Sequence, residues 1–228
     1  MIVQKMLTLF TQDSSPPVDI LRVTQLLRFC SAHDILNLIR SYNTRDSQSW
    51  QKMKLLLDIV PSLHTEAANE VVLTLVKENI ISGLSASLMI NTMALNAQPT
   101  PKLIDQCLQV YKLKMQTSQH DKLVVRSLIL SVGSLANRLK EKHQSMGVDR
   151  QTTITVLRGF VRDIRSMFQT SRSDDEKSRL IKTIGNFGEP SFLPELKSII
   201  KNEQFPPHVR VFAMKALLGF CYMPEVKD

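Results

Sequence analysis

The sequence has few of the residues that build metal sites or disulfide frameworks. Its 228 residues include three cysteines and five histidines. Cys30, Cys107 and Cys221 lie far apart, so they form neither a zinc-ligand pair nor a dense disulfide network, and the odd count leaves at least one unpaired. No two histidines stand three or four residues apart, so no helix presents a two-histidine metal face. We therefore predict no metal site.

Glycine is also scarce, with seven residues, and this limits cofactor-binding loops. Gly185 and Gly188, in the segment GNFG, lack the preceding strand and the third glycine of a dinucleotide-binding loop. Neither a phosphate-binding loop nor a nucleophile elbow is written in the sequence. Helix packing at Gly185 and helix capping at Gly188 explain these glycines better. We predict no catalytic residue and no cofactor, and hence a protein that is not an enzyme.

Long apolar runs and aromatic residues are few as well. The longest uncharged stretch, residues 79–101, contains several Ser, Asn and Gln residues, which excludes a transmembrane helix. Near the N-terminus the only apolar run is residues 6–10, which is too short for a secretory signal. Aromatic residues make up 6% of the chain, so few side chains are available to stack on bases. This argues against a nucleic-acid partner.

What the sequence does contain is helical periodicity. Apolar residues make up 43% of the chain, enough to fill one or two cores. Near the end they recur at helical spacing, at Val209, Phe212, Ala213, Ala216, Leu217 and Phe220. The segment 123–139 is apolar nearly all round, as expected for a helix covered on both sides. No strand pattern is evident, and we predict an all-α protein.

The capping signals predict where the helices begin. Ser173 with Glu176 is a capping box, Gly188 suits a left-handed position after a helix, and Pro206 with Pro207 starts the next helix. The same reasoning gives helix starts near Pro17, Ser31, Ser47, Thr65, Ser85, Pro101, Asp121, Asp149, Ser173, Pro190 and Pro207. Two helices together occupy about 34 residues, the size of one antiparallel hairpin in a helical solenoid. The predicted architecture is an α-solenoid of paired antiparallel helices.

The charge of the chain is concentrated in its second half. The net charge is +8, and residues 115–228 carry 18 basic against 12 acidic side chains. Arg158, Arg162 and Arg165 share one face of a predicted helix, and this face could meet phosphate or an acidic partner. The alternative is a solvated face opposite the apolar residues Leu157, Val161, Ile164 and Phe168.

Several phrases, in order along residues 15–228, carry a family resemblance. They include LLR with SAHDIL (26–36), LLLDIVPSLHTEAA (55–68), Pro99 with Thr100, residues 128–139, LIKTIGNFGEPSFLPELKSII (180–200), PPHVRVFAMKALLGF (206–220) and PEV (224–226). This ordered set resembles the superhelical segment of the large lipid transfer proteins: vitellogenins, apolipophorins, apolipoprotein B and microsomal triglyceride transfer protein. His64 stands where the pattern usually has glycine or a similar small residue.

The resemblance implies a fold and a role. It implies a two-layer right-handed superhelical horseshoe that forms one vitellinogen-like domain over residues 1–228. It also implies a fragment of a longer secreted chain, without the N-terminal β-barrel and the sheets that line the lipid cavity. The implied role is non-enzymatic lipid transport, in which this segment braces the cavity sheets of the same parent chain while they hold phospholipid or neutral lipid. Pro99, Thr100, Gly185, Asn186 and Gly188 carry over as structural motif residues.

Two other classes of function are compatible with the sequence. A HEAT-like interaction scaffold would bind a protein or nucleic-acid partner through its basic face. A helical enzyme would require titratable groups to converge in the fold, which no spacing in the sequence reveals.

Overall fold

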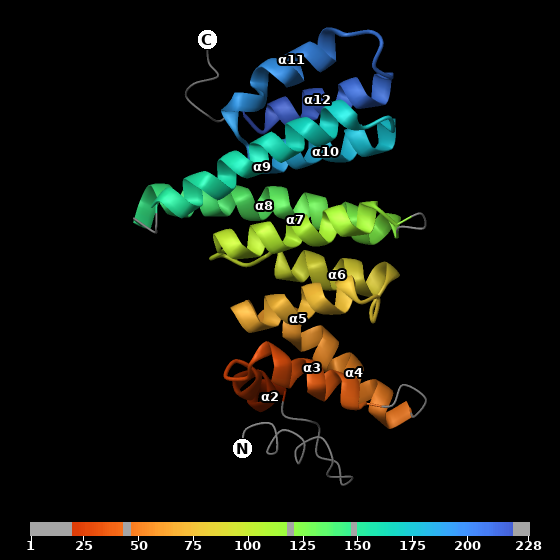
Figure 1. Cartoon of the computed structure of the whole chain (residues 1–228), viewed down its shortest axis with the longest axis vertical. Coiled ribbons are helices and arrows are strands. Elements are labelled where there is room, and N and C mark those ends of the chain that lie inside the picture. The colour runs from red at the N-terminus through yellow and green to blue at the C-terminus, as the bar shows by residue number, and fades with distance from the viewer. Residues whose placement is uncertain (1–19, 43–46, 118–120, 147–149, 221–228) are drawn as a thin grey trace. The chain divides into compact units, whose positions relative to one another are not determined.

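The computed structural model describes residues 20–42, 47–117, 121–146 and 150–220, and every regular element within these ranges is helical (Figure 1). The prediction of an all-α protein is therefore confirmed. Backbone packing divides the chain into two compact units, residues 1–93 and 94–228. The organisation of the chain as a single domain stays a prediction.

In the first unit, the helices pack around a short 3₁₀ helix, η1. The elements are α2 (Ile20–Leu27), α3 (Ala32–Ser41), α4 (Ser47–Ile59), η1 (Val60–Leu63), α5 (Glu66–Lys77) and α6 (Gly83–Met93). The η1 segment contacts α2, α4, α5 and α6, while α5 also contacts α3. Leu27, Ile35, Leu56 and Leu75 are fully buried in the core of this unit.

The turn between η1 and α5 has a histidine in a conformation that favours glycine. His64 ends η1 with φ 53° and ψ 23°, in the left-handed region that a side chain disfavours. Directly after it, Thr65 caps α5, and its side-chain oxygen accepts a hydrogen bond from the backbone N–H of Ala68 at 3.1 Å. The turn is therefore formed with a histidine in a backbone conformation suited to glycine.

The second unit is a stack of helix pairs. Its elements are α7 (Pro101–Met115), α8 (Lys122–Met146), α9 (Arg150–Thr170), α10 (Asp174–Phe187), η2 (Pro190–Phe192), α11 (Leu193–Lys201) and α12 (Pro207–Leu218). Neighbours in sequence pack together, and so do helices two apart: α7 with α9, α8 with α10, and α10 with α12. Figure 1 shows these pairs stacked within the unit. This contact pattern is typical of a helical solenoid.

Helix α8 is the most fully covered element of this unit. It contacts α7, α9 and α10. Its apolar residues Val125, Leu128, Ile129, Val132, Leu135 and Ala136 have no exposed surface, and Ser127 and Ser131 are buried among them. The prediction that residues 123–139 form a helix covered by its neighbours is confirmed.

Most helix starts lie where the capping signals predict them. Ser31 forms a complete capping box with Asp34, and α4, α7 and α12 begin at Ser47, Pro101 and Pro207. Helix α6 begins at Gly83, two residues before the predicted Ser85. The predicted starts at Pro17 and Asp149 lie outside the described residues.

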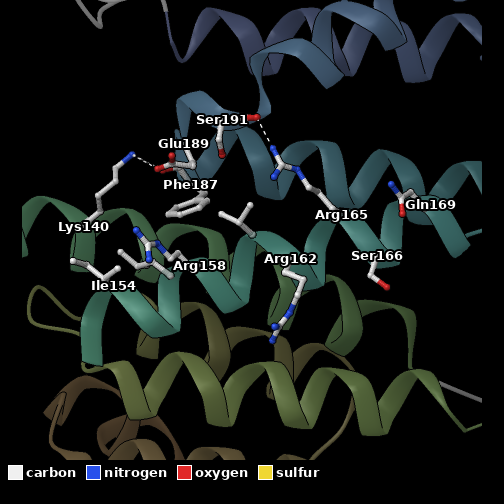
Figure 2. A pocket seen from close by; sticks show the side chains of 12 residues that line it. Lys140, Ile154, Arg158, Arg162, Arg165, Ser166, Gln169, Phe187, Glu189 and Ser191 are labelled. Carbon is white, nitrogen blue, oxygen red and sulfur yellow. Dashed lines mark hydrogen bonds and ion pairs between the residues drawn. The ribbon is translucent and has the colours of Figure 1, made fainter. Parts of the chain in front are cut away.

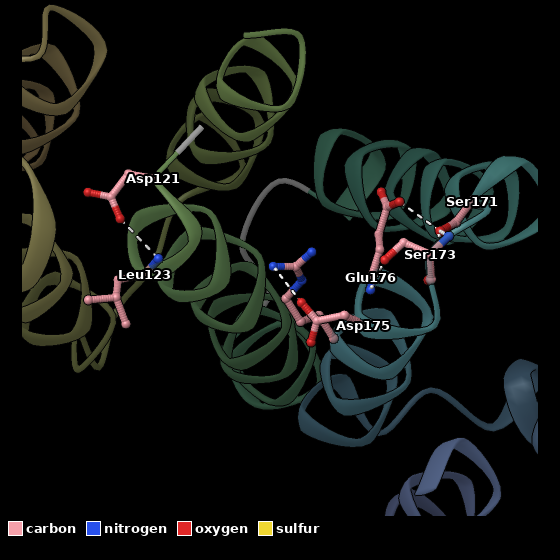
Figure 3. Close-up of polar contacts among 7 residues, drawn as sticks. Asp121, Leu123, Ser171, Ser173, Asp175 and Glu176 are labelled. Carbon is pink, nitrogen blue, oxygen red and sulfur yellow. Dashed lines mark hydrogen bonds and ion pairs between the residues drawn. The ribbon is translucent and has the colours of Figure 1, made fainter. Parts of the chain in front are cut away.

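The capping box predicted at Ser173 is only half formed. The Ser173 hydroxyl accepts the backbone N–H of Glu176, but the Glu176 carboxylate accepts the Ser171 hydroxyl at 2.6 Å (Figure 3). The Ser173 N–H donates instead to the Ser171 hydroxyl at 3.3 Å. The Glu176 carboxylate thus bonds the Ser171 hydroxyl in place of the Ser173 backbone N–H that a complete capping box would use.

Candidate functional site

The basic face predicted from the sequence lies on α9, beside a pocket of about 700 Å³. The pocket is lined from α8, α9, the end of α10 and the segment after it, by Lys140, Ile154, Leu157, Arg158, Val161, Arg162, Arg165, Ser166, Gln169, Phe187, Glu189 and Ser191. The structure therefore places all three predicted arginines at one pocket. Figure 2 shows that their side chains point in different directions, with Arg165 directed toward Ser191 and Arg162 directed away from it.

Arg165 is part of the helix packing. Its Nε donates to the Glu195 carboxylate at 2.6 Å, and a terminal nitrogen donates to the Ser191 carbonyl at 2.6 Å. Its guanidinium also lies 5.1 Å from the centre of the Phe192 ring. These contacts join α9 to η2 and α11 and leave Arg165 little capacity for an outside partner.

Arg158 and Arg162 differ from Arg165. Both side chains are exposed, and neither forms a hydrogen bond or an ion pair with the residues that the structure describes. The available part of the predicted basic face is therefore these two guanidinium groups above a wall of Leu157 and Val161.

The buried face of α9 differs from the one expected. Phe160 and Ile164 are 2% and 1% exposed, whereas Leu157 and Val161 are only half-buried and line the pocket with the arginines. Phe160 packs edge-on against Phe187 of α10, with ring centres 5.1 Å apart, so the face of α9 that carries Phe160 is the one turned to α10. The arginines and the two aliphatic residues thus share one surface.

The residues of the GNFG segment all take part in helix contacts. A Cβ on Gly185 would lie 3.1 Å from the Cβ of Ala216, so this glycine permits the close approach of α10 and α12. The Asn186 side chain donates to the carbonyl of Leu130 at 3.4 Å. Gly188 has φ 61°, and its N–H donates to the carbonyl of Ile184 at 3.0 Å, which closes the last turn of α10.

Lys140 supports the same turn, and no spacing in the sequence predicted it. Its ammonium donates to the Gly188 carbonyl at 2.5 Å and lies 3.8 Å from the Glu189 carboxylate. It also lies 5.3 Å from the centre of the Phe187 ring. Because 48 residues separate Lys140 from Gly188, only the pairing of α8 with α10 reveals this contact.

The Pro99 and Thr100 motif forms the entry to α7. Pro99 is buried, and the Thr100 hydroxyl accepts the N–H of Leu103 at 3.2 Å. Arg138 of α8 donates to the backbone carbonyls of Ala94 and Asn96 in the preceding segment. The predicted motif residues therefore lie at helix ends and helix contacts, and they do not converge on one cavity.

The described residues offer little reactive chemistry. No group of three His, Cys, Asp or Glu side chains among them could hold a metal ion, and no helix in the part described is long and apolar enough to cross a membrane. Burial raises the pKa of the Cys107 thiol to about 12, and burial followed by the charge of Asp34 raises that of Cys30. Both thiols therefore stay protonated and unreactive at neutral pH.

Comparison with known proteins gives a consistent result. The family model of the vitellogenin TPR domain matches residues 1–223. A solved structure concerned with lipid–protein interactions in lipovitellin matches with a TM-score of 0.71 and 15% identity, over 96% of this chain and 23% of that one. The chain thus spans about a quarter of the lipovitellin chain, and its all-α superhelical fold is confirmed. No curated protein sequence matches.

Proposed function

The chain belongs to the vitellogenin TPR domain family, and from that premise we propose that it is the helical scaffold of a secreted lipid carrier. In this role it braces the sheets around a lipid cavity of the same parent protein and performs no catalysis. The lipovitellin relative, solved to describe its lipid–protein interactions, supports the lipid role.

The observation that carries the proposal is that α12 is apolar on both of its faces. Val209, Ala213 and Ala216 face inward and are buried. On the other side Val211, Met214 and Leu218 follow one another at helical spacing and are 40%, 46% and 63% exposed. Although α12 also carries Arg210 and Lys215, an apolar stripe left exposed on a helix normally marks a contact surface. We name these three residues the α12 stripe and propose that an apolar surface of the carrier covers it.

Helix α6 of the first unit has the same character. Ala86, Met89 and Ile90 are buried, while Leu84 and Leu88, one turn apart, are 65% and 56% exposed. Each unit therefore presents an apolar helix face, as a scaffold for lipid-holding sheets requires.

A flotation experiment tests the lipid role. The 228-residue chain is centrifuged with a phosphatidylcholine and triolein emulsion, and we expect it to float with the lipid at both low and high salt. Burying the exposed halves of Met214 and Leu218 is worth about 1 kcal/mol each, so Met214→Ser with Leu218→Ser lowers the partition by about thirtyfold.

A matched control distinguishes the stripe from general apolarity. Leu95 and Leu113 are 65% and 41% exposed but belong to no stripe, and replacing both with serine should change flotation by less than about threefold. Failure of the wild-type chain to float, or equal losses in both double variants, would contradict the proposed function.

The second candidate is an interaction scaffold that binds an acidic protein or nucleic acid through Arg158 and Arg162. The observation that favours it is the absence of described partners for these two guanidinium groups. It predicts binding to RNA or an acidic peptide that weakens steeply with salt and is lost in Arg158→Gln with Arg162→Gln. Such binding without flotation would support this candidate over the lipid role.

A further inference from the structure

A second pocket, of about 290 Å³, lies where α10 meets the start of α8 and the start of α12. Figure 3 shows two of its lining residues, Leu123 at the start of α8 and Asp175 at the start of α10. The full lining is Lys122, Leu123, Arg126, Asp175, Ser178, Arg179, Lys182, His208 and Phe212. It belongs to the second unit and shares no residue with the pocket beside α9.

The charge of this pocket is strongly unbalanced. Four cationic side chains line it, from Lys122, Arg126, Arg179 and Lys182, against the single carboxylate of Asp175. That carboxylate is 72% exposed and lies 3.5 Å from a terminal nitrogen of Arg179. A mostly solvated carboxylate offsets little of the positive potential of the other cations.

Two polar side chains of the pocket are buried with unused hydrogen-bonding capacity. Arg179 is 8% exposed, and its Nε has no hydrogen-bond partner among the described residues. Ser178 is 5% exposed, and its hydroxyl lacks a partner within the same part of the chain. Buried donors without acceptors are costly, so an acceptor that reached either group would stabilise it.

Lys182 gives independent support. Its ammonium lies 3.7 Å from the centre of the Phe212 ring. Burial lowers its pKa first, and the nearby charges of Arg126 and Lys215 lower it further, against the opposing effect of Asp175. Neighbouring cations that disfavour the protonated form of Lys182 indicate a local excess of positive potential, which a bound anion would reduce.

From this geometry we infer that the pocket binds a phosphate group, held by Arg126, Ser178, Arg179 and Lys182. Phosphate suits it because the lining supplies guanidinium, ammonium and hydroxyl donors, and because phosphate offers several acceptor oxygens. The group comes from a lipid headgroup or from a small soluble phosphate. The inference does not depend on the lipid role proposed above, since it uses neither the α12 stripe nor the pocket beside α9.

Titration calorimetry with inorganic phosphate at constant ionic strength tests the site. The wild-type chain should show saturable binding, and Arg126→Gln should weaken it by about tenfold or more. Arg126 is exposed, so this variant should retain the wild-type helical circular dichroism. Lys197→Gln, which removes the same charge from an exposed position in the same unit, should change the affinity by less than about twofold.

Two further probes identify the source of the phosphate. Glycerol 3-phosphate represents a soluble ligand, and vesicles of phosphatidylcholine with phosphatidic acid represent a headgroup. Vesicle binding that requires Arg126 supports a lipid headgroup, whereas binding of glycerol 3-phosphate alone supports a soluble phosphate. The inference is overturned if inorganic phosphate gives no saturable binding, or if Lys197→Gln weakens binding as much as Arg126→Gln.

Discussion

Gly133 of α8 lies close against the backbone of α10, and this contact provides a quantitative test of the packing. A Cβ on this residue would lie 2.6 Å from the backbone carbonyl oxygen of Thr183 and 3.1 Å from its methyl group. Thr183 is fully buried, and its single hydroxyl proton lies within reach of two carbonyls, that of Arg179 at 3.0 Å and that of Ile129 at 3.3 Å. Gly133→Ala therefore forces α8 and α10 apart at a point where moving either backbone would disturb buried packing and the hydrogen bonds of Thr183.

The magnitude follows from two opposing effects. Overpacking a well-packed contact costs about 3 kcal/mol at the upper end, because the clash is with backbone. The higher helix propensity of alanine over glycine stabilises the folded state by about 1 kcal/mol. The expected net loss is about 2 kcal/mol, which corresponds to a decrease in Tm of about 4–8 °C for a chain of this size.

Gly159 of α9 provides the matched control, because a Cβ there would meet nothing within 4 Å. Gly159→Ala should gain helix propensity without a clash and stabilise the protein by about 0.5–1 kcal/mol. Urea and thermal unfolding, followed by circular dichroism at the helical minimum, measure both variants. The reasoning is refuted if Gly133→Ala is as stable as the wild type, or if the two variants shift stability in the same direction.

Three further predictions concern separate parts of the chain. His64→Gly should raise the free energy of unfolding by about 1 kcal/mol, because it relieves the left-handed conformation, and equal or lower stability in urea would contradict this. Lys140→Met should lower the free energy of unfolding by about 1–2 kcal/mol through loss of the bond to the Gly188 carbonyl, whereas the exposed Lys197→Met should change it by less than about 0.5 kcal/mol in the same urea assay. Burial raises the pKa of the Cys107 thiol from 9.0 to about 12, so the unfolded chain loses this proton at lower pH than the folded chain, and the free energy of unfolding should fall as pH rises from about 9 to 12. Cys107→Ala should make this fall, measured by urea unfolding at each pH, less steep. An unchanged slope in the variant would count against the burial of this thiol.

Local signals in the sequence were sufficient for much of the fold. Ser31, Thr65 and Thr100 cap helices because their hydroxyls reach N–H groups three residues ahead, an interaction that nearby sequence alone determines. The covered helix α8 was predictable for a similar reason, since its apolar residues leave no polar face to expose.

The features that sequence reasoning missed depend on partners distant in the chain. The buried face of α9 is set by Phe187, which is 27 residues after Phe160. The phosphate pocket combines Arg126 and Lys182, which are on different helices. Even a local motif differs from its prediction, because the Ser171 hydroxyl donates to the Glu176 carboxylate that the predicted capping box would have used. Periodicity predicts which residues form a helix, but not which side chains of other helices meet it.

Hydrogen–deuterium exchange of the 228-residue chain, with and without the phosphatidylcholine and triolein emulsion, tests the central claim most directly. Without the carrier surface that we propose covers it, the α12 stripe should contact the emulsion, so amides across Pro207–Leu218 should exchange more slowly there, while those of Pro101–Met115 should not change. An unchanged α12 on the emulsion, together with slower exchange around Arg158 and Arg162 when RNA is added, would contradict the lipid scaffold.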